Sequence, residues 1–188
     1  MYLMLGRNRR KQKRYSRKPR APGHGVTTES ELKPLSQRES QISRLIEGNT
    51  GFPLTTDNEV ELLQDGSQTF SRIFETLKDA RESIHVQYYI FEEGELADRL
   101  LELFTQKEAE GVEVRLIYDS IGSLSLSRAY LNKLREAGIE VYNFLPYSFG
   151  RFLTSLNYRN HRKIIVVDGK IAFTGGINIS DKYLKGDD

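Results

Sequence analysis

Helical and strand patterns alternate along most of this chain, and this alternation restricts the fold more than any other feature of the sequence. Runs of β-branched and aromatic residues, which are typical of buried strands, occur at residues 83–91, 112–118, 139–144 and 162–167. Amphipathic segments with apolar residues at helical spacing lie between the first three of these runs, at residues 95–110 and 127–137. We therefore predict an α/β sandwich with a mixed sheet.

Further elements are predicted on either side of this alternating region. Ser67 is a candidate cap for a helix whose apolar residues are Phe70, Ile73, Phe74 and Leu77. A short helix is expected over Gln37–Glu47 and a strand over Val60–Leu63. Residues 171–174 are expected to pair with the strand at 162–167 as a hairpin, across a turn at Asp168-Gly169-Lys170.

A histidine, a lysine and an aspartate stand at fixed offsets around the last long strand, as His161, Lys163 and Asp168. Residues two apart on a strand point to the same side, so the imidazole of His161 and the ammonium of Lys163 are expected side by side. Such a pair can attack a phosphorus centre and hold its oxygens without a metal, and we expect neither a metal nor another cofactor. Asp168 falls on the opposite face beside Gly169, and its first interpretation is structural, with the carboxylate bonding local backbone N–H groups. The alternative for His161 and Lys163 is a charged strand end at the surface.

This pattern, together with the residues around it, resembles the HKD signature of the phospholipase D superfamily. The similarity is to the first HKD motif of bacterial cardiolipin synthases and covers roughly residues 50–188. It rests on the segments Gln87–Phe91, Tyr118–Ser123, Tyr158–Lys163 and Thr174–Asp181. A bare HxKxxxxD pattern would be a weak signal, but here Gly175-Gly176-Ile177-Asn178 follows at the family's position.

The resemblance implies a fold in which two α/β halves each donate one motif to a shared active site. This chain holds one motif, so it resembles one half of the usual two-domain phospholipase D arrangement, which a second HKD half or a homodimer would complete. The implied reaction is a two-step transfer through a phosphohistidine, from one phosphatidylglycerol to another, giving cardiolipin and glycerol. His161 is implied to be the nucleophile or the acid/base, Lys163 and Asn178 to be phosphate ligands, and Asp168 to support the strand end.

Two other functions stay open at this point. One is a single-HKD phosphodiesterase or nuclease that acts as a homodimer, and the other is an inactive fragment that binds anionic lipid. The net acidic charge of the chain after residue 20 argues against the nuclease. We therefore expect an anionic phospholipid, phosphatidylglycerol, as the partner, and no nucleic acid.

The charge of the chain is unevenly distributed. Residues 1–20 contain nine of the 28 Lys and Arg residues and none of the 26 acids. We predict a basic tail and linker at residues 1–35, either bound to an anionic membrane surface or solvated and disordered, and a phospholipase D-like domain at residues 36–188. Met1–Leu5 followed by cations is typical of the end of a membrane helix with a cytoplasmic flank. We expect the cytoplasmic face of a bacterial cell membrane, with no spanning helix within this chain.

Four other features of the sequence carry expectations of their own. His85 stands between Ile84 and Val86 in an apolar strand, and is expected to be buried and hydrogen-bonded. Asp119 follows a strand and is expected to form a turn or a cap, although a carboxylate there can also bind a polar group near the site. Gly175 and Gly176 are expected to permit a close backbone approach. The aromatic loop at residues 147–160 is expected to contact lipid or to pack on its own core. The sequence contains no cysteine, which excludes disulfides and thiol catalysis.

Overall fold

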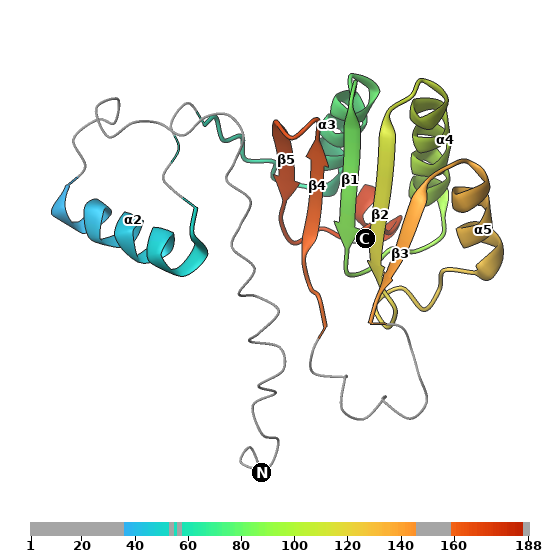
Figure 1. Ribbon diagram of the computed structural model, residues 1–188. Coiled ribbons are helices and arrows are strands. Elements are labelled where there is room, and N and C mark those ends of the chain that lie inside the picture. The colour runs from blue at the N-terminus through green and yellow to red at the C-terminus, as the bar shows by residue number, and fades with distance from the viewer. Residues whose placement is uncertain (1–35, 53–54, 56–57, 146–158, 186–188) are drawn as a thin grey trace, which may run out of the picture. The chain divides into compact units, whose positions relative to one another are not determined.

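The computed structural model of the chain describes residues 36–52, 55, 58–145 and 159–185 (Figure 1). The chain consists of two compact units, residues 1–61 and residues 62–188. The expectations for the basic tail and for most of the aromatic loop lie outside the described residues. Each unit is described by itself. None of the described helices is long and apolar enough to cross a bilayer.

The described part of the first unit contains helix α2 (Gln37–Thr50). Its N-terminus is closed by a capping box, in which the Ser36 hydroxyl accepts from the Glu39 N–H and the Glu39 carboxylate accepts from the Ser36 N–H. Gly51 ends the helix in the left-handed conformation, with φ of 74°. The expected helix is confirmed and continues three residues further than predicted, whereas the predicted strand at Val60–Leu63 is wrong. Val60 is 91% exposed, and a short apolar run without a neighbouring strand has no partner for its backbone.

The second unit is built on a five-stranded mixed sheet, as predicted. Its strands are β1 (Ser83–Tyr88), β2 (Glu113–Asp119), β3 (Glu140–Phe144), β4 (Lys163–Val167) and β5 (Ile171–Thr174). Their order is β3-β2-β1-β4-β5, in which β1, β2 and β3 are parallel and β4 and β5 run antiparallel to their neighbours. The last strands form the expected hairpin, whose turn residues Asp168 and Gly169 both have positive φ, 52° and 65°. Turns of this hand match the twist of the paired strands.

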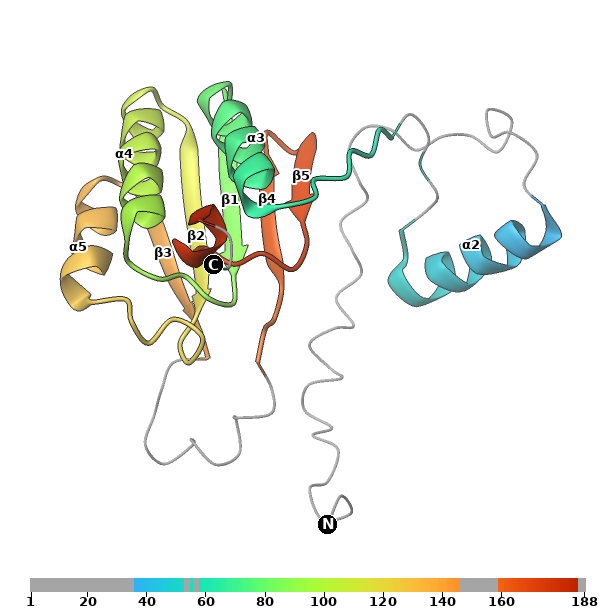
Figure 2. The same ribbon diagram turned by 180° about the vertical axis from the view of Figure 1, so that it is seen from behind.

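Helices α3 (Gly66–Lys78), α4 (Glu95–Ala109), α5 (Arg128–Glu136) and α7 (Lys182–Lys185) lie on one face of this sheet (Figures 1 and 2). The core fills the space between these helices and the alternate strand residues that point toward them. Its largest fully buried side chains are Phe70, Ile73, Leu77, Ile84, Phe91, Leu96, Leu100, Phe104, Leu116, Leu134, Ile165 and Ile179.

The helix ends follow local capping chemistry with one correction. Ser127 caps α5 as expected, accepting from the Tyr130 N–H at 3.0 Å. The cap of α3 is Asp65, which accepts from the Gln68 N–H at 2.8 Å, and the prediction of Ser67 is wrong by two residues. Both residue types cap helices well, so composition alone does not distinguish between them.

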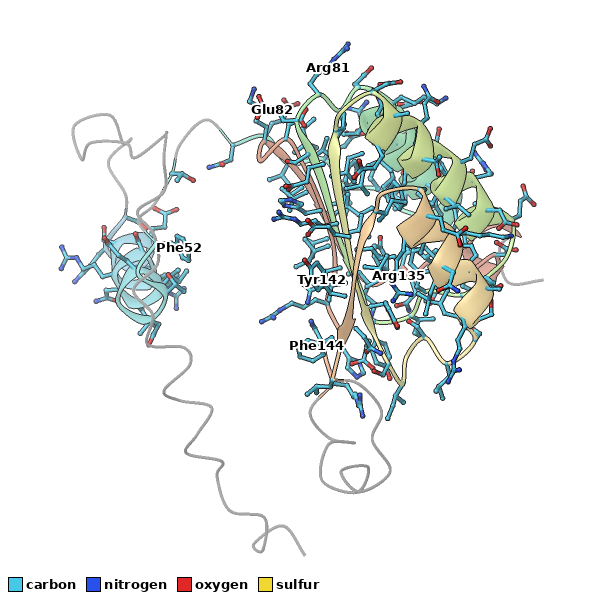
Figure 3. The ribbon with its side chains drawn as sticks, turned by 45° about the vertical axis from the view of Figure 1, so that its right-hand side comes forward. Phe52, Arg81, Glu82, Arg135, Tyr142 and Phe144 are labelled. Carbon is cyan, nitrogen blue, oxygen red and sulfur yellow. The ribbon has the colours of Figure 1, made fainter. Side chains whose placement is uncertain are left out.

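The other face of the sheet carries a row of polar side chains across β1, β2 and β3. His85 Nε2 lies 3.0 Å from the Glu113 carboxylate, Arg115 bridges Glu113 and Glu140, and the Tyr142 hydroxyl donates to Glu140 at 2.8 Å. Figure 3 labels Tyr142, whose side chain lies on the face away from the helices. His85 is therefore hydrogen-bonded, as expected, but its side chain is 45% exposed and the expectation of burial is wrong. Ile84 and Val86 point into the core, and the alternation of the strand sends His85 to the opposite face.

Candidate active site

His161 and Lys163 converge on one aromatic ring at the start of β4. Tyr88 at the end of β1 is paired with Lys163, which places the next residue, Tyr89, beside the approach to β4. The His161 ring stacks on the Tyr89 ring, with centroids 4.0 Å apart and planes inclined by 14°. Lys163 Nζ lies 5.4 Å from the centroid of the same ring and donates to the His161 carbonyl oxygen at 3.0 Å. The imidazole and the ammonium are thus neighbours, as the two-residue spacing predicts, and His161 is exposed.

Asn178 is held beside the same place by the residues that follow Tyr89. Its Oδ1 accepts from the Ile90 N–H at 3.3 Å, and its Nδ2 donates to the Tyr183 hydroxyl at 3.3 Å. The backbone reinforces this, because Ile179 donates to the Ile90 carbonyl oxygen at 3.2 Å and accepts from the Glu92 N–H at 2.9 Å. The amide nitrogen has two N–H groups, and one of them donates to Tyr183.

Asp181, which is not among the site residues predicted from the sequence, anchors the loop of Asn178 to helix α4. Its two carboxylate oxygens accept from the Glu95 and Leu96 N–H groups, each at 2.8 Å. A carboxylate at a helix N-terminus satisfies amide groups that have no partner within the helix. A Cβ at Gly94 would lie 2.3 Å from Asp181 Oδ2, so a side chain at residue 94 would displace this carboxylate from its position.

Asp119 is buried at the end of β2 and organises two segments of the site. Its Oδ1 accepts from the Ile121 and Gly122 N–H groups at 2.9 and 3.1 Å, which is the expected turn. Its carboxylate also faces Arg159 Nη1 at 3.6 Å and the Asn160 N–H at 3.4 Å. Side-chain exposure is 5% for Arg159 and 0% for Asp119, so this ion pair is shielded from water. Asp119 therefore holds the residues that lead into His161.

Asp168 occupies the opposite end of β4 from His161. Its carboxylate accepts from the Arg81, Glu82 and Ser83 N–H groups at 2.8–2.9 Å, which ties the hairpin turn to the start of β1. The partners are backbone N–H groups, as the structural interpretation requires, but they lie far away in the sequence and are not local. Burial by itself would raise the pKa of this carboxyl, but the hydrogen bonds from Ser83, Glu82 and Arg81, together with nearby Lys170, lower the pKa below its usual value.

The Asp168→Asn substitution is expected to lower the free energy of unfolding by about 1–2 kcal/mol at pH 7, because the charge that accepts these hydrogen bonds is lost. The folded-state pKa is lowered, so the stabilisation is present above the unfolded-state pKa and disappears as the pH falls through the folded-state pKa. Urea unfolding at pH 7 and at pH 3 measures this difference. The exposed Asp79, substituted in the same way, is the control. A difference from the wild type that does not shrink at pH 3 would exclude this role.

Two expectations about the surroundings of the site have different outcomes. A Cβ at Gly175 or Gly176 would meet no atom within 4 Å, so the expected close approach of backbone at these glycines is wrong. The close approaches in this unit occur at Gly66, Gly94 and Gly122. The aromatic loop is described only at Arg159 and Asn160, and its contact with lipid stays a prediction.

The arrangement defines a class of protein. The mixed sheet with helices on one face, as Figure 2 shows, is the α/β fold of the phospholipase D type. His161 and Lys163 lie at the start of β4, and Asn178 accepts a hydrogen bond from Ile90, which follows Tyr89. NucT from Helicobacter pylori shares this fold, with a TM-score of 0.51 and 18% sequence identity over 65% of this chain and 74% of that one.

Comparison with protein families then gives the particular group. Residues 73–188 match the family described as cardiolipin synthase, PLD-like domain, and the chain belongs to this family. It is 38% identical over 191 residues to a cardiolipin synthase of Alkalihalophilus pseudofirmus, covering 97% of this chain and 38% of that protein. It is 42% identical over 151 residues to cardiolipin synthase 1 of Bacillus cereus, covering 80% of this chain and 30% of that protein. The chain thus spans well under half the length of these relatives.

Proposed function

We propose that this chain is the half of a cardiolipin synthase that carries the first HKD motif, and that the enzyme completed by a second half transfers a phosphatidyl group between two phosphatidylglycerol molecules. The observation that supports this most is the convergence of His161 and Lys163 on Tyr89, next to Asn178. A nucleophilic or acid/base imidazole beside a fixed cation is what transfer at a phosphodiester requires. The similarity to curated cardiolipin synthases supports the lipid as substrate.

In the proposed reaction, an imidazole nitrogen forms a bond to the phosphorus of one phosphatidylglycerol while the bond from phosphorus to the glycerol oxygen breaks. A second histidine, supplied by another half, gives its proton to the departing glycerol. The same histidine then takes the proton from a hydroxyl of a second phosphatidylglycerol, whose oxygen attacks the phosphohistidine and releases the first histidine. His161 takes one of these two roles. Lys163 and Asn178 stabilise the charge on the non-bridging oxygens in both steps.

This reaction requires two histidines at one phosphorus. Among the described residues, His85 lies on the other face of the sheet and is held by Glu113, so it is unsuited to be the second histidine. We propose that a second HKD half, or a second copy of this chain, completes the site. Because the acceptor is a lipid hydroxyl, the completed site also has to keep water from the phosphohistidine.

The test measures cardiolipin and glycerol formed from phosphatidylglycerol vesicles, by mass spectrometry. The chain is assayed at a concentration where it is monomeric, and again when it is joined to a second half of the same family. We expect transfer only in the completed enzyme. Robust cardiolipin formation by a chain shown to be monomeric would contradict the half-site argument. If the completed enzyme releases phosphatidic acid and forms no cardiolipin, its activity is that of a phospholipase and not of a transferase.

We further propose that the basic N-terminal segment holds the protein on an anionic bilayer at the cytoplasmic face of the membrane. Deleting residues 1–20 removes nine cations and is expected to weaken binding to phosphatidylglycerol vesicles at least about 10-fold, since each cation near a charged membrane contributes about 1 kcal/mol. Vesicle sedimentation at low and high salt measures this change, and neutral vesicles are the control. Equal binding by the truncated and intact chains would leave the segment without this role.

A further inference from the structure

Tyr89 contacts the imidazole of His161 and the ammonium of Lys163 through the face of its ring. The His161 ring lies parallel to it at 4.0 Å, and Lys163 Nζ lies 5.4 Å from its centroid. The face of a phenol ring is electron-rich, so it attracts cations. Aromatic rings also pack favourably on such a face in an offset stack. The ring therefore favours one position for an imidazole that is otherwise exposed at the start of a strand.

The backbone of Tyr89 is fixed by the turn that follows β2. The buried Ser123 hydroxyl donates to the Tyr89 carbonyl oxygen at 3.1 Å and accepts from the Phe91 N–H at 3.0 Å. A Cβ at Gly122 would lie 2.1 Å from the Tyr89 carbonyl oxygen, so the turn passes directly against this peptide. The same turn is closed by Asp119, whose carboxylate also faces Arg159 and Asn160. One turn thus fixes the backbone of Tyr89 and the chain that leads into His161.

We propose that Tyr89 is a positioning residue, which orients His161 and Lys163 toward the phosphodiester through the face of its ring, and that Gly122 and Ser123 hold Tyr89 for this purpose. The inference rests on the proposed function. Tyr89 acts through the two residues that contact substrate, so removing its ring leaves the chemistry possible but misplaces the imidazole. A displacement of about 1 Å at a reacting group costs on the order of 100-fold in rate.

The test compares Tyr89→Leu with Tyr89→Phe in the enzyme completed with its second half. Tyr89→Leu is expected to lower kcat about 10- to 100-fold with little change in KM. The substitution affects the orientation of the imidazole in the transition state, whereas lipid binding is retained. Tyr89→Phe keeps the ring face and is expected to keep kcat within about 3-fold of the wild type. Tyr142→Leu, which removes an exposed tyrosine of β3 whose hydroxyl donates to Glu140, is the matched control.

A proton NMR spectrum of this chain adds a readout that does not depend on activity. The chain contains three histidines, and His161→Ala assigns the resonances of His161. The ring of Tyr89 should shift the His161 Cε1 proton upfield, and this shift should disappear in Tyr89→Leu and persist in Tyr89→Phe. Gly122→Ala should reduce the same shift by pushing on the Tyr89 peptide, whereas Gly48→Ala, where a Cβ meets nothing within 4 Å, should not.

The outcomes separate this inference from the proposed function. A kcat of Tyr89→Leu equal to that of the wild type, or the same loss of kcat in Tyr89→Phe as in Tyr89→Leu, would overturn the positioning role. Neither result would contradict the proposed transferase function. An unchanged His161 resonance in Tyr89→Leu would overturn the stacking itself. If His161→Ala keeps its transferase activity, the proposed function fails, whatever the Tyr89 variants do.

Discussion

His161→Ala is expected to lower phosphatidyl transfer by the completed enzyme at least about 10⁴-fold, since either role of the imidazole is needed in both chemical steps. The same substitution should leave the midpoint of thermal unfolding nearly unchanged. His161 is exposed, so the substitution removes the stack on Tyr89 but no contact in the hydrophobic core. Initial rates of cardiolipin formation and a thermal melt of the same preparation measure the two effects.

His85→Ala is the matched control for this experiment. It also removes an exposed histidine, whose Nε2 lies 3.0 Å from the Glu113 carboxylate on the face of the sheet away from the helices. We expect full transferase activity from this variant. Retained transfer in His161→Ala, or a comparable loss of transfer in His85→Ala, would remove the basis for assigning the chemistry to the start of β4.

Asp119→Ala is expected to lower the free energy of unfolding by about 3–5 kcal/mol, because it leaves the buried Arg159 cation without this carboxylate. The variant also loses the hydrogen bonds that close the turn at Ile121 and Gly122, so the support of Tyr89 is weakened as well. Urea unfolding followed by circular dichroism measures the change in free energy. Asp119→Asn keeps one acceptor oxygen, so its free energy of unfolding is expected to fall by less than that of Asp119→Ala.

The control for Asp119 is Glu140→Ala, which removes a carboxylate that also pairs with an arginine. The Arg115 and Glu140 side chains are 43% and 46% exposed, and a solvated pair of this kind contributes about 0–1 kcal/mol. We expect the two alanine variants to differ clearly in stability. A loss of less than about 1 kcal/mol in Asp119→Ala would show that the pair with Arg159 is not shielded from water in solution.

Most elements of the second unit follow from local patterns in the sequence. Runs of β-branched and aromatic residues, the turn at Asp168-Gly169 and the helical spacing of apolar residues locate all five strands of the sheet and the helices α3, α4 and α5 to within a few residues. The same reasoning fails for Val60–Leu63, where a short apolar run has no neighbouring strand. It also misplaces His85, because an apolar strand with one exposed face reads like a strand that is buried on both.

The site is predictable only where its residues are close in sequence. The pairing of His161 with Lys163 follows from a spacing of two, and the turn after β4 follows from Asp168-Gly169. The stack on Tyr89 depends on the register between β1 and β4, and the pair of Asp119 with Arg159 joins segments 40 residues apart in the sequence. Such contacts depend on tertiary pairing, for which one sequence carries no periodic signal. Tyr89 and Asp119 do lie in the segments that resemble cardiolipin synthases, and this resemblance is the signal in the sequence that points to them.

The most direct test of whether His161 and Lys163 bind a lipid phosphodiester is an NMR titration of this chain with monomeric short-chain phosphatidylglycerol. The His161 ring protons should shift in a saturable way, the shift should be lost in Lys163→Met, and the His85 protons should stay where they are. A His161 resonance that does not respond to the lipid, or that responds equally without Lys163, would contradict the assignment of this strand end to the headgroup phosphate.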